Sequence, residues 1–267
     1  MRRAILLAAF AALLAGARAQ NREISLTEYA SLESVCGQAR ESDELLPMNE
    51  LGMESGYLLY ESRIELPEGG ARLTLEHVRD YAAVYLDGRF LGTLTDACKS
   101  LDIRAPGGCH TLRLYAENIG RITYGPEILD NSKGLFGRAS LNGTEITGWR
   151  IVPLGIQTAD PAGLDYVPLC GTSCEPGFRR GRFDAPDPAF RYLDVSGWGM
   201  GEVWINGCYL GSYWTAERQQ SIPVPDGLLR PKANVLVVFD LENSTPAAKM
   251  HLSTHPVWRE SDASSGR

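Results

Sequence analysis

Short apolar runs bounded by turn residues dominate the sequence from about residue 56 to residue 241. The runs recur roughly every 8 to 12 residues and show no 3.6-residue period, so they predict strands rather than helices. This spacing is typical of an antiparallel β-sandwich or jelly roll, and we therefore expect an all-β fold. The expected strands lie at 57–60, 63–66, 71–75, 82–86, 90–94 and 112–116, and again at 190–195, 202–205, 209–214, 221–224 and 235–241.

The clearest single element is a β-hairpin at 198–214. An alternation of inward and outward positions is followed by Asn206-Gly207, a dipeptide that favours the tight turn of a hairpin. The same pattern occurs at 83–92, with Asp87-Gly88 at the turn and a constant offset of 119 positions between the two copies. A repeat this long indicates tandem domains, because the repeats of a solenoid are only about 20 to 50 residues long.

These patterns divide the chain into two tandem galactose-binding-like jelly-roll sandwiches with segments around them. The segment before the first sandwich is polar and has no sustained period, so at most a short helix is expected there. The segment between the sandwiches is rich in proline and glycine, which predicts a linker wrapped over the second domain. The expected boundaries are 1–19 for a signal peptide, 20–50 for the lead-in segment, 51–147 for the first jelly roll, 148–181 for the linker, 182–258 for the second jelly-roll core and 259–267 for a flexible tail.

The first 19 residues have a charged start, an apolar run and a small-residue cleavage site, which together predict a secretory signal peptide. We therefore expect a secreted protein, extracellular or periplasmic. No stretch reaches the roughly 20 apolar residues of a spanning helix, so no membrane span is expected. Loss of three arginines with the signal changes the formal net charge from −7 to −10. This acidity, without a basic cluster, argues against a nucleic-acid partner.

Six cysteines remain after the signal, and an oxidising compartment permits up to three disulfides in any of about 15 pairings. The first pair that we expect is Cys98 with Cys109, because each lies beside a strand of the first domain. Cys170 and Cys174 have one residue too many between them for a thioredoxin-like motif. A disulfide or two buried thiols are expected at that position.

Several motifs resemble, in the same order, the C-terminal β-domains of the family 35 glycoside hydrolases, the β-galactosidases. They are PMNELG at 47–52, GYLLY at 56–60, AENIGRITYG at 116–125, GL at 134–135, GWGMG at 197–201 through Trp214, and FDLE at 239–242. In that family the two catalytic glutamates lie on a (β/α)₈ barrel, which needs about 250 residues. Only some thirty residues separate the signal peptide from the first β-domain here. The resemblance therefore implies the part of such an enzyme without the catalytic barrel.

Within the matched region, Met200 and Ser212 stand where the family usually has basic residues. No residue is assigned to catalysis. The histidines at 251 and 255 have helical spacing, but Pro256 argues against a helix, so no metal site is expected, and no cofactor is expected either.

Aromatic side chains of the second repeat are the candidates for stacking on a sugar ring. Trp204 is the first choice, because Val203 and Ile205 would point into the core and leave its indole outward. The alternative, that the large aromatic residues fill the sandwich core, stays open. The candidate ligand-binding residues are Trp204, Asn206, Trp214 and Arg121.

The favoured function is that of a secreted, non-catalytic, carbohydrate-associated protein that binds a galactose-containing glycan. The alternative is a β-galactosidase fragment or subunit that supports a separately encoded catalytic barrel chain in glycoside hydrolysis. A purely structural interaction module is a third hypothesis, because a fold alone does not fix a function.

Overall fold

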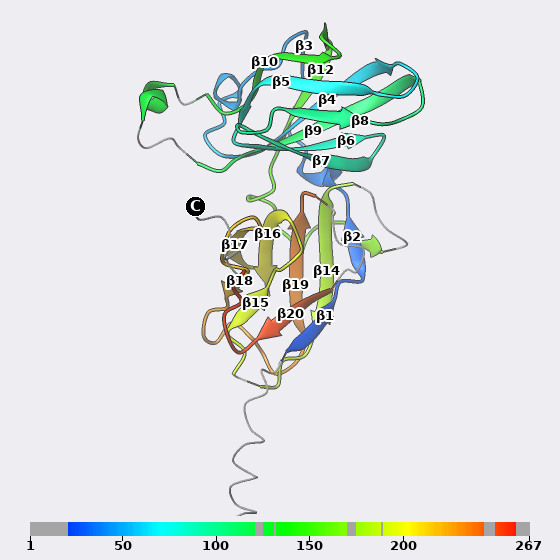
Figure 1. Cartoon of the computed structure of the whole chain (residues 1–267). Coiled ribbons are helices and arrows are strands. Elements are labelled where there is room, and N and C mark those ends of the chain that lie inside the picture. Colours follow the sequence, from blue (N-terminus) through cyan, green and yellow to red (C-terminus); the bar gives the residue numbers. More distant parts are fainter. Residues whose placement is uncertain are drawn as a thin grey trace, which may run out of the picture.

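A computed structural model describes residues 21–120, 125–130, 132–169, 175–187, 189–242 and 249–259. These residues form strands, turns and three short 3-10 helices, with no longer helix among them, so the all-β prediction is confirmed. The strands build two β-sandwiches, one above the other in Figure 1, each made of a four-stranded and a six-stranded sheet. The 3-10 helices are η1 (Leu32–Val35), η2 (Met48–Leu51) and η3 (Pro126–Leu129).

The first sandwich occupies the upper half of Figure 1 and encloses an apolar core that includes the fully buried Trp149. Its strands are β3 (Arg40–Ser42), β4 (Gly56–Leu66), β5 (Ala71–Arg79), β6 (Tyr81–Leu86), β7 (Arg89–Thr95), β8 (Ser100–Ile103), β9 (Gly108–Asn118), β10 (Gly134–Leu141), β11 (Thr144–Glu145) and β12 (Trp149–Leu154). The smaller sheet has the order β11-β10-β5-β8, and the larger sheet has the order β3-β12-β4-β9-β6-β7.

The second sandwich lies below the first in Figure 1 and has its own apolar core, which includes Trp198. Its strands are β1 (Arg22–Ser25), β2 (Glu28–Ala30), β13 (Val167–Pro168), β14 (Gly177–Phe183), β15 (Tyr192–Asp194), β16 (Met200–Ile205), β17 (Cys208–Trp214), β18 (Ser221–Pro223), β19 (Asn234–Asp240) and β20 (Lys249–Ser253). The smaller sheet has the order β1-β20-β15-β18, and the larger sheet has the order β13-β2-β14-β19-β16-β17.

The two six-stranded sheets end in equivalent hairpins, β6–β7 and β16–β17, as the sequence repeat predicts. The turn residues Asp87 and Gly88 have φ angles of 48° and 78°, and Asn206 and Gly207 have φ angles of 52° and 80°. Turns in this left-handed region suit Asn, Asp and Gly and match the twist of the paired strands. Both hairpins also shift register at the valine three residues before the turn. The two copies of the unit therefore agree in turn, register and position in the sheet.

Several strands that the expected boundaries placed outside the sandwiches belong to them, including β1, β2, β3 and β12. The lead-in segment supplies β1 and β2 to the second sandwich and β3 to the first, and Figure 1 shows the blue β1 and β2 strands beside the lower half. Strand β12, placed by the sequence in the linker, pairs with β4 inside the first sandwich. Strands β1 to β3 have only three or four residues. Such short segments cannot show an alternating pattern, so the sequence left them outside the sandwiches.

The outer faces of the two six-stranded sheets share a third apolar cluster, which joins the sandwiches. On β6, Tyr81, Ala83 and Tyr85 belong to this cluster, and the alternate residues of the strand belong to the first core. Strand β16 is divided in the same way between the second core and the shared cluster. All six residues of β6 and of β16 are therefore buried. We call this shared cluster the inter-sandwich interface.

Candidate functional site: a cavity between the sandwiches

A cavity of about 600 Å³ lies between the two sandwiches. The end of β9 and the following residues form one part of its wall, and β17 and the segment leading into β18 form another. Aromatic, amide and carboxyl side chains line the same space, which is a common composition for a small-molecule site. The lining residues are Ser55, Glu117, Asn118, Ile119, Gly120, Gln157, Val195, Met200, Leu210, Ser212, Tyr213, Trp214, Glu217, Gln219, Ser221, Ile222 and Pro223.

Two buried glutamates, one from each sandwich, meet at Tyr57 beside this cavity. The hydroxyl oxygen of Tyr57 lies 3.0 Å from Oε1 of Glu117 and 2.9 Å from Oε1 of Glu202. Gln157 Nε2 donates to the same Glu202 oxygen at 2.9 Å, and the Tyr209 hydroxyl donates to Oε2 at 2.6 Å. Glu117 is 6% exposed and Glu202 is 0% exposed. The two carboxyl groups are therefore held by hydrogen bonds within the inter-sandwich interface.

The surroundings of Glu117 favour its neutral form. Burial raises the pKa of Glu117 to about 8, and the carboxylate of Glu202 acts in the same direction. The geometry leads to the same result, because Tyr57 has one hydroxyl proton for two carboxyl neighbours. When Tyr57 donates to Glu202, a proton on Glu117 completes the other contact. Oε2 of Glu117 is buried without a hydrogen-bond partner in the described part of the chain.

The two glutamates do not form the carboxyl pair of a retaining glycosidase, in which a carboxylate must reach the sugar as nucleophile. Both oxygens of Glu202 accept hydrogen bonds from neighbouring side chains. Glu202 is also fully buried and is not among the residues that line the cavity. A substrate atom in the cavity cannot reach this carboxylate in the observed arrangement, so we assign no catalytic role to the pair.

Trp214 is the predicted ligand-binding residue that lines the cavity. It lies at the end of β17, paired with Met200, and it is half-buried. The ring of Tyr81, from the other sandwich, packs against the indole with centroids 5.8 Å apart and an interplanar angle of 72°. Tyr81 in turn donates a short hydrogen bond to Glu242. Contacts from both sandwiches therefore fix the position of Trp214 in the cavity wall.

The expectation that Trp204 is exposed is wrong. Its indole does point away from the second core, as the alternation with Val203 and Ile205 predicted, but the first sandwich covers it. Trp204 is 3% exposed, and its ring packs against Phe178 and Tyr209 at centroid distances of 6.0 Å and 5.5 Å. Trp204 is part of the inter-sandwich interface and is not accessible to a ligand.

Asn206 holds the hairpin turn rather than lining the cavity. Its Nδ2 donates to the backbone oxygen of Leu228 at 2.8 Å and to Oδ1 of Asn234 at 2.9 Å. Its Oδ1 accepts from the backbone nitrogen of Val235 at 2.9 Å. The side chain thus connects the β16–β17 turn to β19 and to the loop before it, and these bonds occupy its polar atoms.

The structure does not describe three of the remaining predicted residues, and it contradicts the predicted disulfide between the other two. Arg121, Cys170 and Cys174 lie outside the described residues. Cys98 and Cys109 are exposed free cysteines, so the expected disulfide is not formed in the structure. Cys109 is paired with Glu65 in the larger sheet of the first sandwich, whereas Cys98 closes the turn after β7 by pairing with Thr95. Proximity to strands of one domain was too weak a criterion, because Cys109 lies on β9 within the larger sheet and Cys98 lies in the turn between β7 and β8.

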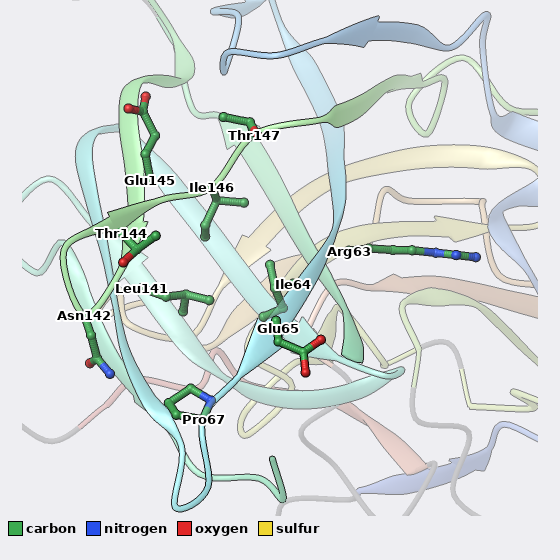
Figure 2. A pocket seen from close by; sticks show the side chains of 10 residues that line it. All are labelled: Arg63, Ile64, Glu65, Pro67, Leu141, Asn142, Thr144, Glu145, Ile146 and Thr147. Carbon is green, nitrogen blue, oxygen red and sulfur yellow. The ribbon is translucent and has the colours of Figure 1, made fainter. Parts of the chain in front are cut away.

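A second hollow of about 350 Å³ lies on the first sandwich, bounded by β4 and by the β10–β11 turn (Figure 2). Its apolar residues are Ile64, Pro67, Leu141 and Ile146, and no aromatic residue lines it. Arg63 and Glu145 point away from each other in Figure 2. Because this hollow has no flat ring surface for a sugar, the cavity beside Trp214 is the better candidate.

The part of the chain that the structure describes has neither a candidate metal site nor a candidate membrane-spanning helix. No group of three or more His, Cys, Asp or Glu side chains is placed to hold a metal ion there. Among the same residues, no helix has the length and apolar character that crossing a bilayer requires.

Two family models match the chain, and the matches follow the two sandwiches. The model described as "Beta-galactosidase, first all-beta domain" matches residues 46–155, and "Beta-galactosidase, galactose-binding domain" matches residues 176–234. The chain is built from β-galactosidase β-domains. The resemblance read from the sequence motifs is thereby confirmed.

Curated β-galactosidases match the same region. The β-galactosidase of Xanthomonas manihotis is 36% identical over 74% of the chain, that of Mus musculus is 33% identical over 70%, and the human β-galactosidase-1-like protein 3 is 32% identical over 74%. The matched regions cover 33%, 32% and 30% of these relatives, so the chain spans about a third of their length. A Pleurotus ostreatus lectin, solved in complex with GalNAc, covers 88% of the chain at a TM-score of 0.28 and 14% identity, and this likeness carries no functional argument.

Sequence reasoning missed Glu117 and Gln157 as residues of the cavity. Glu117 appeared in the sequence only as part of the AENIGRITYG motif, although a carboxyl group directly after the apolar residues Leu114 to Ala116, at the end of β9, was a sign of a polar contact there. Gln157 lies in the segment interpreted as a linker, where no local pattern marks it. Both reach the cavity because the two sandwiches pack together, which a single-domain pattern does not reveal.

Proposed function

We propose that the protein is a secreted, non-catalytic, β-galactosidase-like protein that binds galactose-containing glycans in the cavity beside Trp214. The observation that carries this proposal is the cavity, in which Trp214 is accompanied by Gln157 and Gln219. An indole offers apolar contact to the C–H groups of a sugar ring, and amides bind its hydroxyls. The name of the second matched family model, a galactose-binding domain, supports this ligand class. The signal-like features of residues 1–19 support secretion.

Replacing Trp214 with alanine is expected to weaken the binding of galactose-containing polymers at least about tenfold, a loss of about 1.4 kcal/mol. Affinity electrophoresis or calorimetry measures the change. Trp258→Ala is the matched control, because Trp258 is 58% exposed and does not line the cavity. The proposal fails if the intact protein binds no such polymer, or if the Trp258 variant loses as much affinity as the Trp214 variant.

The purified chain is expected not to hydrolyse aryl β-galactosides. Among the described residues, Glu202 is shielded by hydrogen bonds from its neighbours, so the buried Glu117–Glu202 pair does not offer a nucleophile to a sugar in the cavity. Release of the aryl group, followed by absorbance, tests this. A turnover that survives repurification and disappears on mutation of one carboxylate of this chain would show that the protein is an enzyme by itself.

A second function is favoured by the length comparison, since the relatives are about three times as long as the matched region. In this hypothesis the β-domains support a catalytic barrel encoded as a separate chain. Coexpression with a neighbouring reading frame for such a barrel tests it. Galactosidase activity that requires both chains would establish this function and would replace the glycan-binding proposal.

A further inference from the structure

The ionisable side chains that line the inter-sandwich cavity are all acidic among the described residues. Glu117 and Glu217 line it, and no Lys, Arg or His is among its lining residues in the described part of the chain. Glu202 lies close to Glu117, because the carboxyl groups of both residues contact the hydroxyl of Tyr57. Nearby cations are engaged elsewhere, because Lys133 Nζ binds the carboxylate of Asp80 at 2.7 Å. Because Glu117 is protonated at pH 7, the negative potential in the cavity comes from Glu217 and Glu202, and it favours a positively charged occupant.

Glu117 adds a specific attachment point to this field. It is 6% exposed, lines the cavity, and has one buried carboxyl oxygen, Oε2, without a partner among the described residues. A buried acceptor without a hydrogen bond is unfavourable, and an ammonium group supplies both a donor and a compensating charge. The indole of Trp214 in the same wall also attracts an organic cation.

We propose that this cavity prefers a sugar-sized ligand that bears a primary amine, whose ammonium group binds Oε2 of Glu117. The inference rests on the proposed glycan-binding function and specifies the substituent that the site selects. An alkylammonium group is charged at pH 7, where Glu117 still holds a proton. Binding then breaks the O–H bond of Glu117, leaves a carboxylate facing the ammonium ion, and releases one proton to the solvent. A neutral galactoside releases none.

The test uses the full chain and three probes with the same galactoside ring, which are methyl β-galactoside, its nearly isosteric 6-amino-6-deoxy analogue and the larger, uncharged N-acetyl derivative of that amine. Isothermal titration calorimetry at pH 7 in phosphate and in Tris reports affinity and proton release together. We expect the amine to bind at least about tenfold more tightly than the other two, with about one proton released. Its affinity should also rise by up to about tenfold per pH unit between pH 6 and pH 7.5.

Glu117→Gln removes the charge but keeps the shape, so it should abolish the preference for the amine and the proton release. Glu145→Gln is the matched control, because Glu145 is exposed and lies in the other hollow (Figure 2). Equal binding of the amine and the neutral galactoside by the native chain overturns this inference and leaves the proposed function in place. Absence of binding by all three probes overturns both. The native chain alone decides these outcomes, so the test does not depend on the folding of a variant.

Discussion

Replacing Trp204 with alanine is expected to lower the free energy of unfolding by about 4 kcal/mol. This value is typical of the loss of stability when a large aromatic side chain in a protein core is replaced by alanine. Trp204 is 3% exposed, and its ring contacts Phe178 and Tyr209. The cavity left by the indole would lie in the inter-sandwich interface, where side chains from both sheets would lose contacts. Urea denaturation followed by circular dichroism measures the loss.

The control for this variant is Trp258→Ala, which removes the same side chain from a site that is 58% exposed. We expect a change below about 1 kcal/mol there, as for most exposed positions. If the two variants were equally stable, Trp204 would not be packed between the sandwiches, and its indole would be available to a ligand after all.

The alternating pattern correctly predicted the face of the sheet on which Trp204 lies, but not what covers that face. A period of two separates the two sides of a strand and says nothing about whether a second layer packs on the outer side. A sign of burial on both sides was present in β6, whose residues Tyr81 to Leu86 are all apolar. An uninterrupted apolar strand is typical of a sheet covered on both faces.

The fold class and the repeat were predictable because they rest on local signals. The Asp87-Gly88 and Asn206-Gly207 turns each fix a hairpin within about ten residues, and both hairpins form at equivalent edges. The pairing of β1 with β20 was not predictable, because it joins Arg22 to Leu252 across most of the chain. The cavity was not predictable for the same reason, because its wall combines segments of both sandwiches that lie far apart in the sequence.

The protein is expected to lose stability as the pH rises from about 5 to about 8, on the order of 3 kcal/mol. Burial and the neighbouring Glu202 raise the pKa of Glu117 to about 8, against 4.5 for an exposed glutamate. The folded chain therefore holds a proton that the unfolded chain has lost across this interval. The stabilising contribution is complete below about pH 4.5 and disappears as the pH passes through 8. Urea denaturation at half-unit steps of pH measures the slope.

Glu117→Gln should flatten this dependence, because glutamine stays neutral and its amide nitrogen can donate to the Tyr57 oxygen in place of the protonated carboxyl group. Asp80 and Glu202 are the charged groups that face Glu117, and both raise its pKa. Burial also raises the pKa of Glu242, which the Tyr81 hydroxyl contacts, so part of the slope should remain in the variant. The Glu145→Gln variant should follow the native profile. Parallel curves for the native chain and Glu117→Gln between pH 5 and pH 8 would show that Glu117 is ionised in the folded protein, and the buried carboxyl pair would then need a cation of its own.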